Sequence, residues 1–483
     1  MPDRFRQHRQ ELAKSIGSEG AALIPAAAET IRNDDVTHEF RQDSNFFYLT
    51  GFAEPEAVAV IVPGHPEGDY HLFVRPRDRD LEIWNGIRAG VDGARERYQA
   101  DVAYEVDQLD ATLARLLVGR RTLHYKFGNP AQDARVTGIV NKARSYRQRT
   151  GKALPTSVSD VSSTLSELRL RKRAEEIESL RVACELSAEG HREAMRYARP
   201  GLFEYQVQAP MEYIWREGGS RRNGYPSIVA SGANACILHY DENDRMIEDG
   251  DLVLIDAACE VDYFSGDITR TFPASGRFTV AQRAVYEVVL AAQHDAISIC
   301  RPGSSIRDIH ETAKRTLTEG LIELGLLPRG LEDSLAMHHY REFFMHGTGH
   351  WLGMDVHDAG SYRVDGVPRA LEPAMSFTVE PGLYIEGREE IEVPLLEYDF
   401  DAWTERTLIE GAAAKDELDT LKKDAPKVRH PIPPEFRGIG VRIEDDILIT
   451  TDGHDNLTSR VPREIDAVEA LCSEISWLIR TPG

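Results

Sequence analysis

The chain has 483 residues, of which 41% are apolar and 28% charged, and its formal net charge is −23 at pH 7. This length is too great for one hydrophobic core, so two or three domains of a soluble protein are expected. The negative charge argues against nucleic acid as a partner, and no apolar run approaches the roughly 20 residues that cross a membrane.

Three further features bear on location and ligand charge. The N-terminus is polar, without the apolar segment of a signal peptide, which favours the cytoplasm. The five cysteines are scattered and form no CxxC pair, so reduced thiols are expected rather than disulfides or a zinc ribbon. The acidic balance could attract peptide amines, although a generic acidic surface is the simpler explanation.

Residues 1–168 mix helix and strand signals. An amphipathic stretch over Phe5–Ile16 is followed by short β-rich runs at 21–27, 57–64 and 71–76. Such a mixture of one helix period and several short apolar runs is typical of a small α/β domain.

The pattern changes near residue 165. Apolar residues at spacings of three or four predict one long helix over 166–199, and Pro200-Gly201 ends it. We place the domain boundary just before this helix, so that the second domain covers 169–483.

The second domain combines helices with strands that are distant in sequence. Further helices are expected around 203–217, 281–300 and 305–324, and strand-like runs precede and follow them. This arrangement predicts an α+β fold for the domain.

One segment of the second domain stands apart. Residues 386–434 are charged, contain a short helical stretch near 412–423, and leave through a proline-rich run. They separate two strands that carry acidic residues, which indicates a surface insertion that serves as a lid or an oligomer contact.

Candidate chemistry begins at DLVLIDAACEVDYFSGDITRTFP. Two apolar strands flank a short connection, and a hairpin with its turn at Val261-Asp262 would set Asp256 opposite Asp267. Isolated aspartates in strands usually face solvent, but Asp256 ends a four-residue apolar run and should enter the interior. Metal ligation is the simplest way to hold a carboxylate there.

A histidine cluster follows in FFMHGTGHWLGMDVHD, with His346, His350 and His357 among glycines. A single histidine here would more often be structural, whereas three indicate a site. The segment is not the HExxH helix of zinc proteases, and its spacing alone does not separate ligands from proton-transfer groups.

The last two acidic residues are Glu380 in FTVEPGLYI and Glu444 in RGIGVRIEDDILIT. Each is expected within a strand whose neighbours are apolar, where an unpaired carboxylate would be costly. Asp445 and Asp446 are expected to mark the strand leaving the interior, and Arg442 should share the face of Glu444.

Together these residues form a set of four carboxylates and one histidine. Oxygen-rich sets suit hard divalent ions, with Mn²⁺ favoured and Co²⁺, Fe²⁺ or Zn²⁺ as alternatives. Four carboxylates exceed the need of one ion but suit two ions about 3.5–4 Å apart, a pair that generates hydroxide near neutral pH and polarises a carbonyl. The set therefore predicts hydrolysis.

At this point the sequence resembles the proline-specific aminopeptidases (aminopeptidase P) of the pita-bread metallopeptidases. The segments RQDSNFFYLTGFAEPEAVAVI and EIWNGIRAG resemble the family's N-terminal domain. The segments ASGANACILHY, GDLVLIDAACE, GDITRTFP, HGTGHWLGMDVHD, TVEPGLYI and RGIGVRIEDDILIT resemble its catalytic domain. The resemblance implies a dinuclear-metal aminopeptidase that releases an N-terminal residue preceding proline by attack of a metal-bridging hydroxide.

The resemblance also implies the metal ligands. Asp267 and Glu444 would bridge the two ions, Asp256 would hold one of them, and His350 and Glu380 would hold the other. Glu380 would in addition take a proton from the attacking water.

Further roles follow from the same resemblance. His239 would flank the substrate, and His346 and His357 would line the pocket, with His357 placed to hydrogen-bond the scissile carbonyl or the developing oxyanion. Arg442 and Tyr384 would be supporting residues.

Two alternatives stay open. The first is a prolidase that cleaves only Xaa-Pro dipeptides. The 386–434 segment, which is longer than the equivalent connection in typical bacterial members, could narrow the cleft mouth and shift preference towards dipeptides, or it could pack against a neighbouring subunit, which is the interpretation we favour. The second is a non-catalytic pita-bread binding protein, although such relatives typically lose ligands and this chain keeps all five. The family often forms dimers or tetramers with the domain of Trp84 near subunit contacts, so a homo-oligomer is expected.

Overall fold

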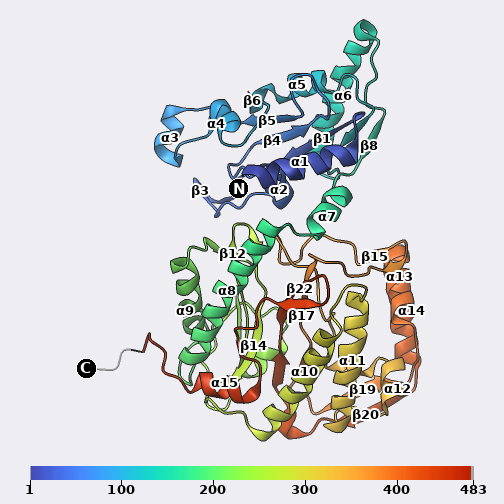
Figure 1. The fold of residues 1–483 in the computed structure, drawn as a ribbon. Helices are drawn as coiled ribbons and strands as arrows, with labels where there is room; N and C mark the ends of the chain where they lie inside the picture. The colour runs from blue at the N-terminus through green and yellow to red at the C-terminus, as the bar shows by residue number, and fades with distance from the viewer. Residues whose placement is uncertain (1, 480–483) are drawn as a thin grey trace. The chain divides into compact units, whose positions relative to one another are not determined.

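The computed structural model describes residues 2–479 and contains the expected mixture of helices and strands (Figure 1). The chain divides into two compact units, one that ends at Arg169 and one that begins at Leu170. Each unit has its own cluster of buried apolar side chains. Within residues 2–479, no helix is long and apolar enough to cross a membrane.

The N-terminal unit is built on a six-stranded sheet in the order β6-β5-β4-β1-β7-β8, as expected for an α/β domain. Its strands are β1 (Gly20–Pro25), β4 (Val58–Ile61), β5 (Tyr70–Val74), β6 (Val102–Glu105), β7 (Thr122–His124) and β8 (Ser157–Ser159), with a separate pair of β2 (Ile31–Asn33) and β3 (Val36–Thr37). Its helices are α1 (Pro2–Ile16), α2 (Ser44–Thr50), α3 (Arg79–Asn85), α4 (Gly90–Glu96), α5 (Leu109–Leu116) and α6 (Pro130–Thr150). Side chains of β4, β5, α5 and α6 meet in one apolar core.

The predicted long helix is two helices, α7 (Ser162–Leu170) and α8 (Ala174–Tyr197). The backbone N–H of Lys172 donates to the carbonyl of Ala374 at 2.8 Å, outside any helical pattern. Glu176 then caps the second helix by accepting from the backbone N–H of Arg173 at 2.8 Å. The prediction of one helix was wrong because the apolar period continues across a break that tertiary hydrogen bonds create.

The second unit packs helices on two sides of its strands (Figure 1). Side chains of α8 and α9 (Glu204–Glu217) pack against β11 (Leu252–Asp256) and β14 (Thr269–Pro273). Side chains of α10 (Val280–Ser298) and α11 (Ile306–Glu323) pack against the strands near the C-terminus. The strands between the two helix pairs are therefore buried on both faces, which explains why their sequences are nearly continuous apolar runs.

The strands form several small antiparallel sheets. The main groups are β10-β11-β14, β13-β12-β9, β17-β22-β23 and β18-β21. The remaining strands are β9 (Arg222–Asn223), β10 (Ile228–Ser231), β12 (Cys259–Val261), β13 (Phe264–Ser265), β15 (Arg363–Val364), β16 (Val367–Pro368), β17 (Ser376–Val379), β18 (Gly382–Ile385), β21 (Ile439–Arg442), β22 (Asp445–Ile449) and β23 (His454–Asn456). The shorter helices α12 (Leu331–Ala336) and α15 (Ile465–Cys472) lie at the surface of this unit.

The hairpin register differs from the prediction. Val261 pairs with Phe264, so the two turn residues are Asp262 and Tyr263, both with left-handed φ angles of 50° and 70°. Such φ values are those of a two-residue type I′ turn. Asp256 consequently pairs with Thr269 rather than with Asp267. The prediction placed the turn one residue too early because it did not anticipate two residues of positive φ.

Residues 386–434 contain more structure than one short helix. The strands β19 (Glu390–Pro394) and β20 (Lys427–Pro431) pair in an antiparallel ribbon, and α13 (Phe400–Glu410) and α14 (Ala412–Asp424) lie between them. The helix α14 matches the predicted helical stretch. The helix α13 was missed, although Asp399 caps it by accepting from the backbone N–H of Ala402 at 3.0 Å.

Candidate metal centre

The five predicted ligand residues line one cavity of about 560 Å³ in the second unit. Asp256 is the last residue of β11, and Asp267 lies two residues before β14. His350 belongs to the loop that precedes β17, Glu380 directly follows β17, and Glu444 lies between β21 and β22. Segments that are far apart in the sequence thus deliver one side chain each to the same place.

Glu380 and Glu444 lie at interruptions between strands rather than within them. The backbone N–H of Glu380 donates to the carbonyl of Thr348 at 2.8 Å, and that of Glu444 donates to the carbonyl of Thr269 at 3.1 Å. These bonds connect the two strand breaks to the histidine loop and to β14. The sequence pattern predicted burial at both positions and missed the break in the ladder.

The polar side chains of the site lie close to one another. The hydroxyl of Tyr225 lies 2.6 Å from Asp256 Oδ1 and 2.5 Å from Asp267 Oδ1. His350 Nε2 lies 3.3 Å from Asp267 Oδ2 and 3.5 Å from Glu380 Oε1. Ligand atoms of Asp267, His350 and Glu444 all lie within 4.8 Å of one another. A small cation placed among these atoms would meet several of them at once.

The charge of the site supports the same interpretation. Burial and neighbouring carboxylates raise the pKa of Glu444 well above its usual value. Burial likewise raises the pKa of Glu380 to about 7 and shifts the pKa of Asp256 upward. Arg442 is the one arginine or lysine among the described residues that line the cavity, and it cannot neutralise four carboxylates. The donor set therefore fits divalent cations, which would supply the missing positive charge.

Arg442 connects several of these groups. Its Nη2 donates to Asp256 Oδ2 at 2.7 Å, and its Nε donates to Thr269 Oγ1 at 3.1 Å. Thr269 Oγ1 in turn donates to Glu444 Oε2 at 2.5 Å, so Arg442 and Glu444 meet at one hydroxyl as their shared face implied. The sequence did not single out Thr269 or Tyr225, although Thr269 follows Asp267 at the two-residue spacing of a strand face.

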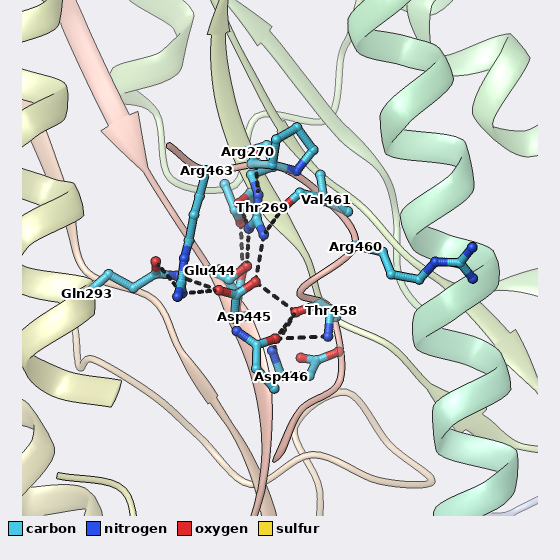
Figure 2. Close-up of polar contacts among 12 residues, drawn as sticks. Thr269, Arg270, Gln293, Glu444, Asp445, Asp446, Thr458, Arg460, Val461 and Arg463 are labelled. Carbon is cyan, nitrogen blue, oxygen red and sulfur yellow. Dashed lines mark hydrogen bonds and ion pairs between the residues drawn. The ribbon is translucent and has the colours of Figure 1, made fainter. Parts of the chain in front are cut away.

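Asp445 and Asp446 do not mark the strand leaving the interior, because both are fully buried. Figure 2 shows Asp445 between Arg270 and Arg463, whose guanidinium nitrogens lie 2.6 Å and 2.7 Å from its carboxylate oxygens. Burial alone would raise the pKa of Asp445, but these two guanidinium groups hold it below its usual value. The apolar core around β22 can accept this carboxylate because its charge is paired twice.

The same buried residues also form hydrogen bonds to the backbone of two residues of the candidate metal centre. Arg270 Nη1 donates to the carbonyl of Glu444 at 2.5 Å, as Figure 2 shows. Asp446 Oδ2 accepts from the backbone N–H of Asp267 at 2.9 Å. Both acidic residues after Glu444 thus fix the positions of the two residues expected to bridge the ions.

The three remaining predicted histidines line the same cavity. His239 and His357 are exposed, whereas His346 is half-buried. The rings of His357 and His350 are 4.3 Å apart in an edge-on arrangement. His346 Nε2 lies 2.8 Å from the Tyr384 hydroxyl, which accepts from Arg442 Nη1 at 3.0 Å. Burial, and secondarily the charge of Arg442, lower the pKa of His346 to about 3, so this ring is neutral at pH 7.

A buried ion pair supports the loop of His357. Lys172 Nζ lies 3.1 Å from Asp358 Oδ2, and both side chains are only 1% exposed. The backbone N–H of Asp358 donates to the carbonyl of Trp351 at 2.8 Å. Lys172 therefore connects the start of α8 to the residue that follows His357.

Comparison with known proteins agrees with this site. The sequence matches the family described as "Metallopeptidase family M24" over residues 178–451, which is more than half of the chain. It also matches "Aminopeptidase P, N-terminal domain" over residues 5–124. The chain belongs to metallopeptidase family M24.

Relatives and solved structures show which type of M24 protein this chain resembles. Xaa-Pro aminopeptidase of Escherichia coli (strain K12) is 39% identical over 97% of both chains. The structure of Pseudomonas aeruginosa aminopeptidase PepP is similar with a TM-score of 0.87 at 43% identity, over 98% of both chains. Zn-substituted E. coli aminopeptidase P in complex with product matches with a TM-score of 0.85 at 39% identity, again over 98% of both chains. Within family M24 the chain is thus of the aminopeptidase P type, and both the predicted resemblance and the pita-bread fold class are confirmed.

Proposed function

We propose that this protein is a metal-dependent Xaa-Pro aminopeptidase that hydrolyses the bond between an N-terminal residue and a following proline. The observation that carries the proposal is the convergence of Asp256, Asp267, His350, Glu380 and Glu444 in one cavity. A non-catalytic binding protein would have no need to keep all five of these costly groups together. The similarity to Xaa-Pro aminopeptidases over nearly the full chain supports the specificity.

The proposed cofactor is a pair of divalent ions, with Mn²⁺ as first choice and Co²⁺, Fe²⁺ or Zn²⁺ as alternatives. Asp267 and Glu444 would bridge them, Asp256 would complete one site, and His350 and Glu380 the other. When bound, such ions lower the pKa of water and polarise a carbonyl. The oxygen-rich donor set supports Mn²⁺, whereas the similar E. coli structure with bound product is of a zinc-substituted enzyme.

The residues of the chain supply the proton and hydrogen-bond chemistry. Glu380 would take the proton from the attacking water, because its carboxylate lies in the cavity with Oε1 3.5 Å from His350 Nε2, among the proposed metal ligands. His357, whose pKa is lowered by burial and by His350, would be a neutral donor to the carbonyl oxygen as negative charge develops there. His239 and His346 would flank the substrate, and Arg442 would hold Asp256 and Tyr384 in place.

The cavity walls suit the ends of an Xaa-Pro unit. The acidic groups around Asp256 and Asp267 would attract the free amine of the substrate. Pro226, Leu238 and Val356 line the same cavity and offer apolar surface for a pyrrolidine ring. We place the proline ring against this surface.

The proposal includes a cytoplasmic homo-oligomer, a dimer or a tetramer. The five cysteines are free thiols, which suits a reducing compartment. The helix α3 and the residues after it expose Ile83, Trp84 and Ile87 by 73%, 83% and 79%. Adjacent exposed apolar side chains of this size are typical of subunit contacts. The proposed partners are peptides. We propose no binding to nucleic acid or to a membrane.

The direct test is an assay of peptide hydrolysis by the metal-stripped protein after Mn²⁺ is restored. We expect release of the first residue from Xaa-Pro-Yaa peptides and no release from Xaa-Ala-Yaa peptides. Activity confined to Xaa-Pro dipeptides would assign the protein to prolidases instead. Absence of any metal-dependent peptide hydrolysis would overturn the proposal.

A further inference from the structure

A second cavity, of about 770 Å³, adjoins the catalytic one, and the two share His346 and Gly347 as lining residues. One wall consists of α11 and the 3₁₀ helix His339–Glu342. Another wall consists of residues 397–401, which belong to the inserted segment between β19 and β20. We call this space the insertion cavity. Both cavities border His346 and Gly347, so the insertion cavity lies next to the catalytic one.

The walls of the insertion cavity are fixed by specific contacts. His338 Nε2 donates to the carbonyl of Tyr398 at 2.8 Å, and its ring lies 4.5 Å from that of Tyr398. The guanidinium of Arg341 lies 4.3 Å above the ring of Phe400. On the catalytic side, His310 Nδ1 lies 2.9 Å from Thr348 Oγ1, which connects α11 to the histidine loop. The insertion therefore forms a defined wall of the cavity.

The charged groups of the insertion cavity differ in how far they are paired. Arg307 forms an ion pair with Asp401 at 2.5 Å, and Lys314 forms one with Glu311. Arg341 forms no ion pair with any residue between 2 and 479, and its Nη2 donates to the carbonyl of Met345 at 3.1 Å. Arg341 thus keeps guanidinium donors that match a carboxylate, and the exposed carboxylates of Glu397 and Asp399 also line the cavity.

The reaction determines which part of a substrate can occupy this space. An aminopeptidase that removes one residue has a single residue on the amine side of the scissile bond, and all other residues lie on the leaving side. A second cavity next to the catalytic one is therefore available mainly to the leaving peptide. An extended chain advances at most about 3.3–3.6 Å per residue, so only peptides of sufficient length would reach Arg341.

We infer that the insertion cavity is a subsite for the part of the peptide beyond proline, in which Arg341 binds the C-terminal carboxylate of a short substrate. This inference rests on the proposed function. It makes Arg341 a specificity residue for peptide length and for a free C-terminus. It also gives the inserted segment a role in selecting substrates longer than a dipeptide.

The test compares Ala-Pro, Ala-Pro-Ala, Ala-Pro-Ala-Ala and Ala-Pro-Ala-Ala-Ala, each as the free acid and as the C-terminal amide. For unmodified protein, kcat/KM should show a preference for the free acid at one length of the series. The Arg341→Met variant should lower kcat/KM for that peptide about tenfold, which corresponds to about 1.4 kcal/mol. Its amide and the dipeptide should change little, and Arg341→Lys should restore part of the preference.

The matched control is Arg315→Met. Arg315 lies on the same helix as Arg307 and Lys314, does not line the cavity, and pairs with Glu332 at 3.0 Å. This variant should leave the length profile as it is. An equal loss with every peptide after Arg341→Met, or no loss with any of them, would overturn the inference.

A second variant removes the wall itself. Leu395 N–H donates to the carbonyl of Pro426 at 2.7 Å, so β19 and β20 are close enough to be joined by a two-residue turn. Replacement of residues 395–426 by Asn-Gly, the preferred type I′ turn, between the paired Pro394 and Lys427 should abolish the free-acid preference. Retention of that preference would contradict the subsite. Failure of unmodified protein to cleave any Xaa-Pro peptide would overturn the proposed function, whereas dipeptide cleavage without dependence on length or carboxylate overturns only this inference.

Discussion

Glu380 lies directly across from Glu444, at the point where two antiparallel ladders separate. On one side of this point Val379 pairs with Asp445, and on the other side Gly382 pairs with Arg442 in the same register. Both glutamates are thus held at facing positions in a protein interior. Two like charges in such positions repel each other, which costs stability unless a cation lies between them.

The facing positions of Glu380 and Glu444 predict how Glu444→Gln changes the stability of the metal-free protein and the further stability that Mn²⁺ adds. The substitution keeps the shape and removes one buried negative charge, so the metal-free variant should unfold at a higher temperature than metal-free wild type. Mn²⁺ at 100 times its dissociation constant should stabilise wild type by about 2.7 kcal/mol, and the variant by much less. Thermal unfolding with and without Mn²⁺ measures both effects, with the exposed Glu435→Gln as control. The same Mn²⁺ effect in wild type and Glu444→Gln would contradict a ligand role.

Glu380→Ala and Asp267→Ala should each abolish turnover while the fold is retained. Glu380 is the proposed proton acceptor, and Asp267 is a proposed bridge between the ions, so no other residue of the cavity can replace either. Steady-state assays after dialysis into Mn²⁺, together with circular dichroism, separate loss of chemistry from loss of fold. Activity near that of wild type in either metal-repleted variant would refute the two-metal mechanism.

Much of the candidate site could be predicted because its acidic residues occur beside apolar runs, where charged side chains are rare. Asp256, Glu380 and Glu444 stand out as acidic residues beside apolar runs, and their burial follows from that pattern alone. Tyr225 carries no such signal, because a tyrosine among loop residues is ordinary. Its contact with Asp256 and Asp267 depends on a tertiary arrangement that no local pattern encodes.

The errors have the same origin. Asp445 and Asp446 were expected to mark the strand leaving the interior, whereas both are buried. Arg270 and Arg463, the partners of Asp445, are distant in sequence, and the network in Figure 2 is visible only once β14 and β22 are neighbours. The hairpin turn was misplaced by one residue, because the turn holds Tyr263 at a left-handed φ, a conformation that bulky non-glycine residues rarely adopt.

His357→Ala should lower kcat by roughly 10²–10³-fold, as expected for loss of one donor to a developing oxyanion. The ring of His357 lies beside that of His350 in the catalytic cavity, so it is close to the proposed ions without being one of their ligands. Measurement of kcat and KM separately with Ala-Pro-Ala is decisive. A change in KM alone would assign His357 to ground-state binding.

Lys172→Met should destabilise the protein by roughly 3 kcal/mol, because it removes a buried cationic partner of the Asp358 carboxylate. Since Asp358 directly follows His357, kcat should fall as well in the protein that remains folded. The double variant with Asp358→Leu removes both charges and should recover part of the lost stability. Urea unfolding of the three proteins measures this, and a double variant no more stable than Lys172→Met would argue that packing, rather than the lost ion pair, explains the loss.

His71 should make the N-terminal unit sensitive to acid. It is fully buried on β5, and burial, followed by the effect of His65, lowers its pKa to about 4. An unfolded histidine has a pKa near 6.5, so above this pH both states are neutral and the residue has no effect on pH dependence. As the pH falls from about 6.5 to about 4, the unfolded chain gains a proton that the folded chain does not, and stability declines by about 3 kcal/mol in total.

His71→Leu should therefore flatten the dependence of stability on pH in this window. Urea midpoints of wild type and variant at pH 7.5, 6, 5 and 4.5 provide the measurement, with far-UV circular dichroism to follow unfolding. Other groups also titrate between these pH values, but they are common to both proteins and cancel in the difference. The difference should be constant above pH 6.5 and should shift in favour of the variant as the pH falls. A difference that stays constant down to pH 4.5 would show that His71 accepts a proton in the folded protein as readily as in the unfolded one.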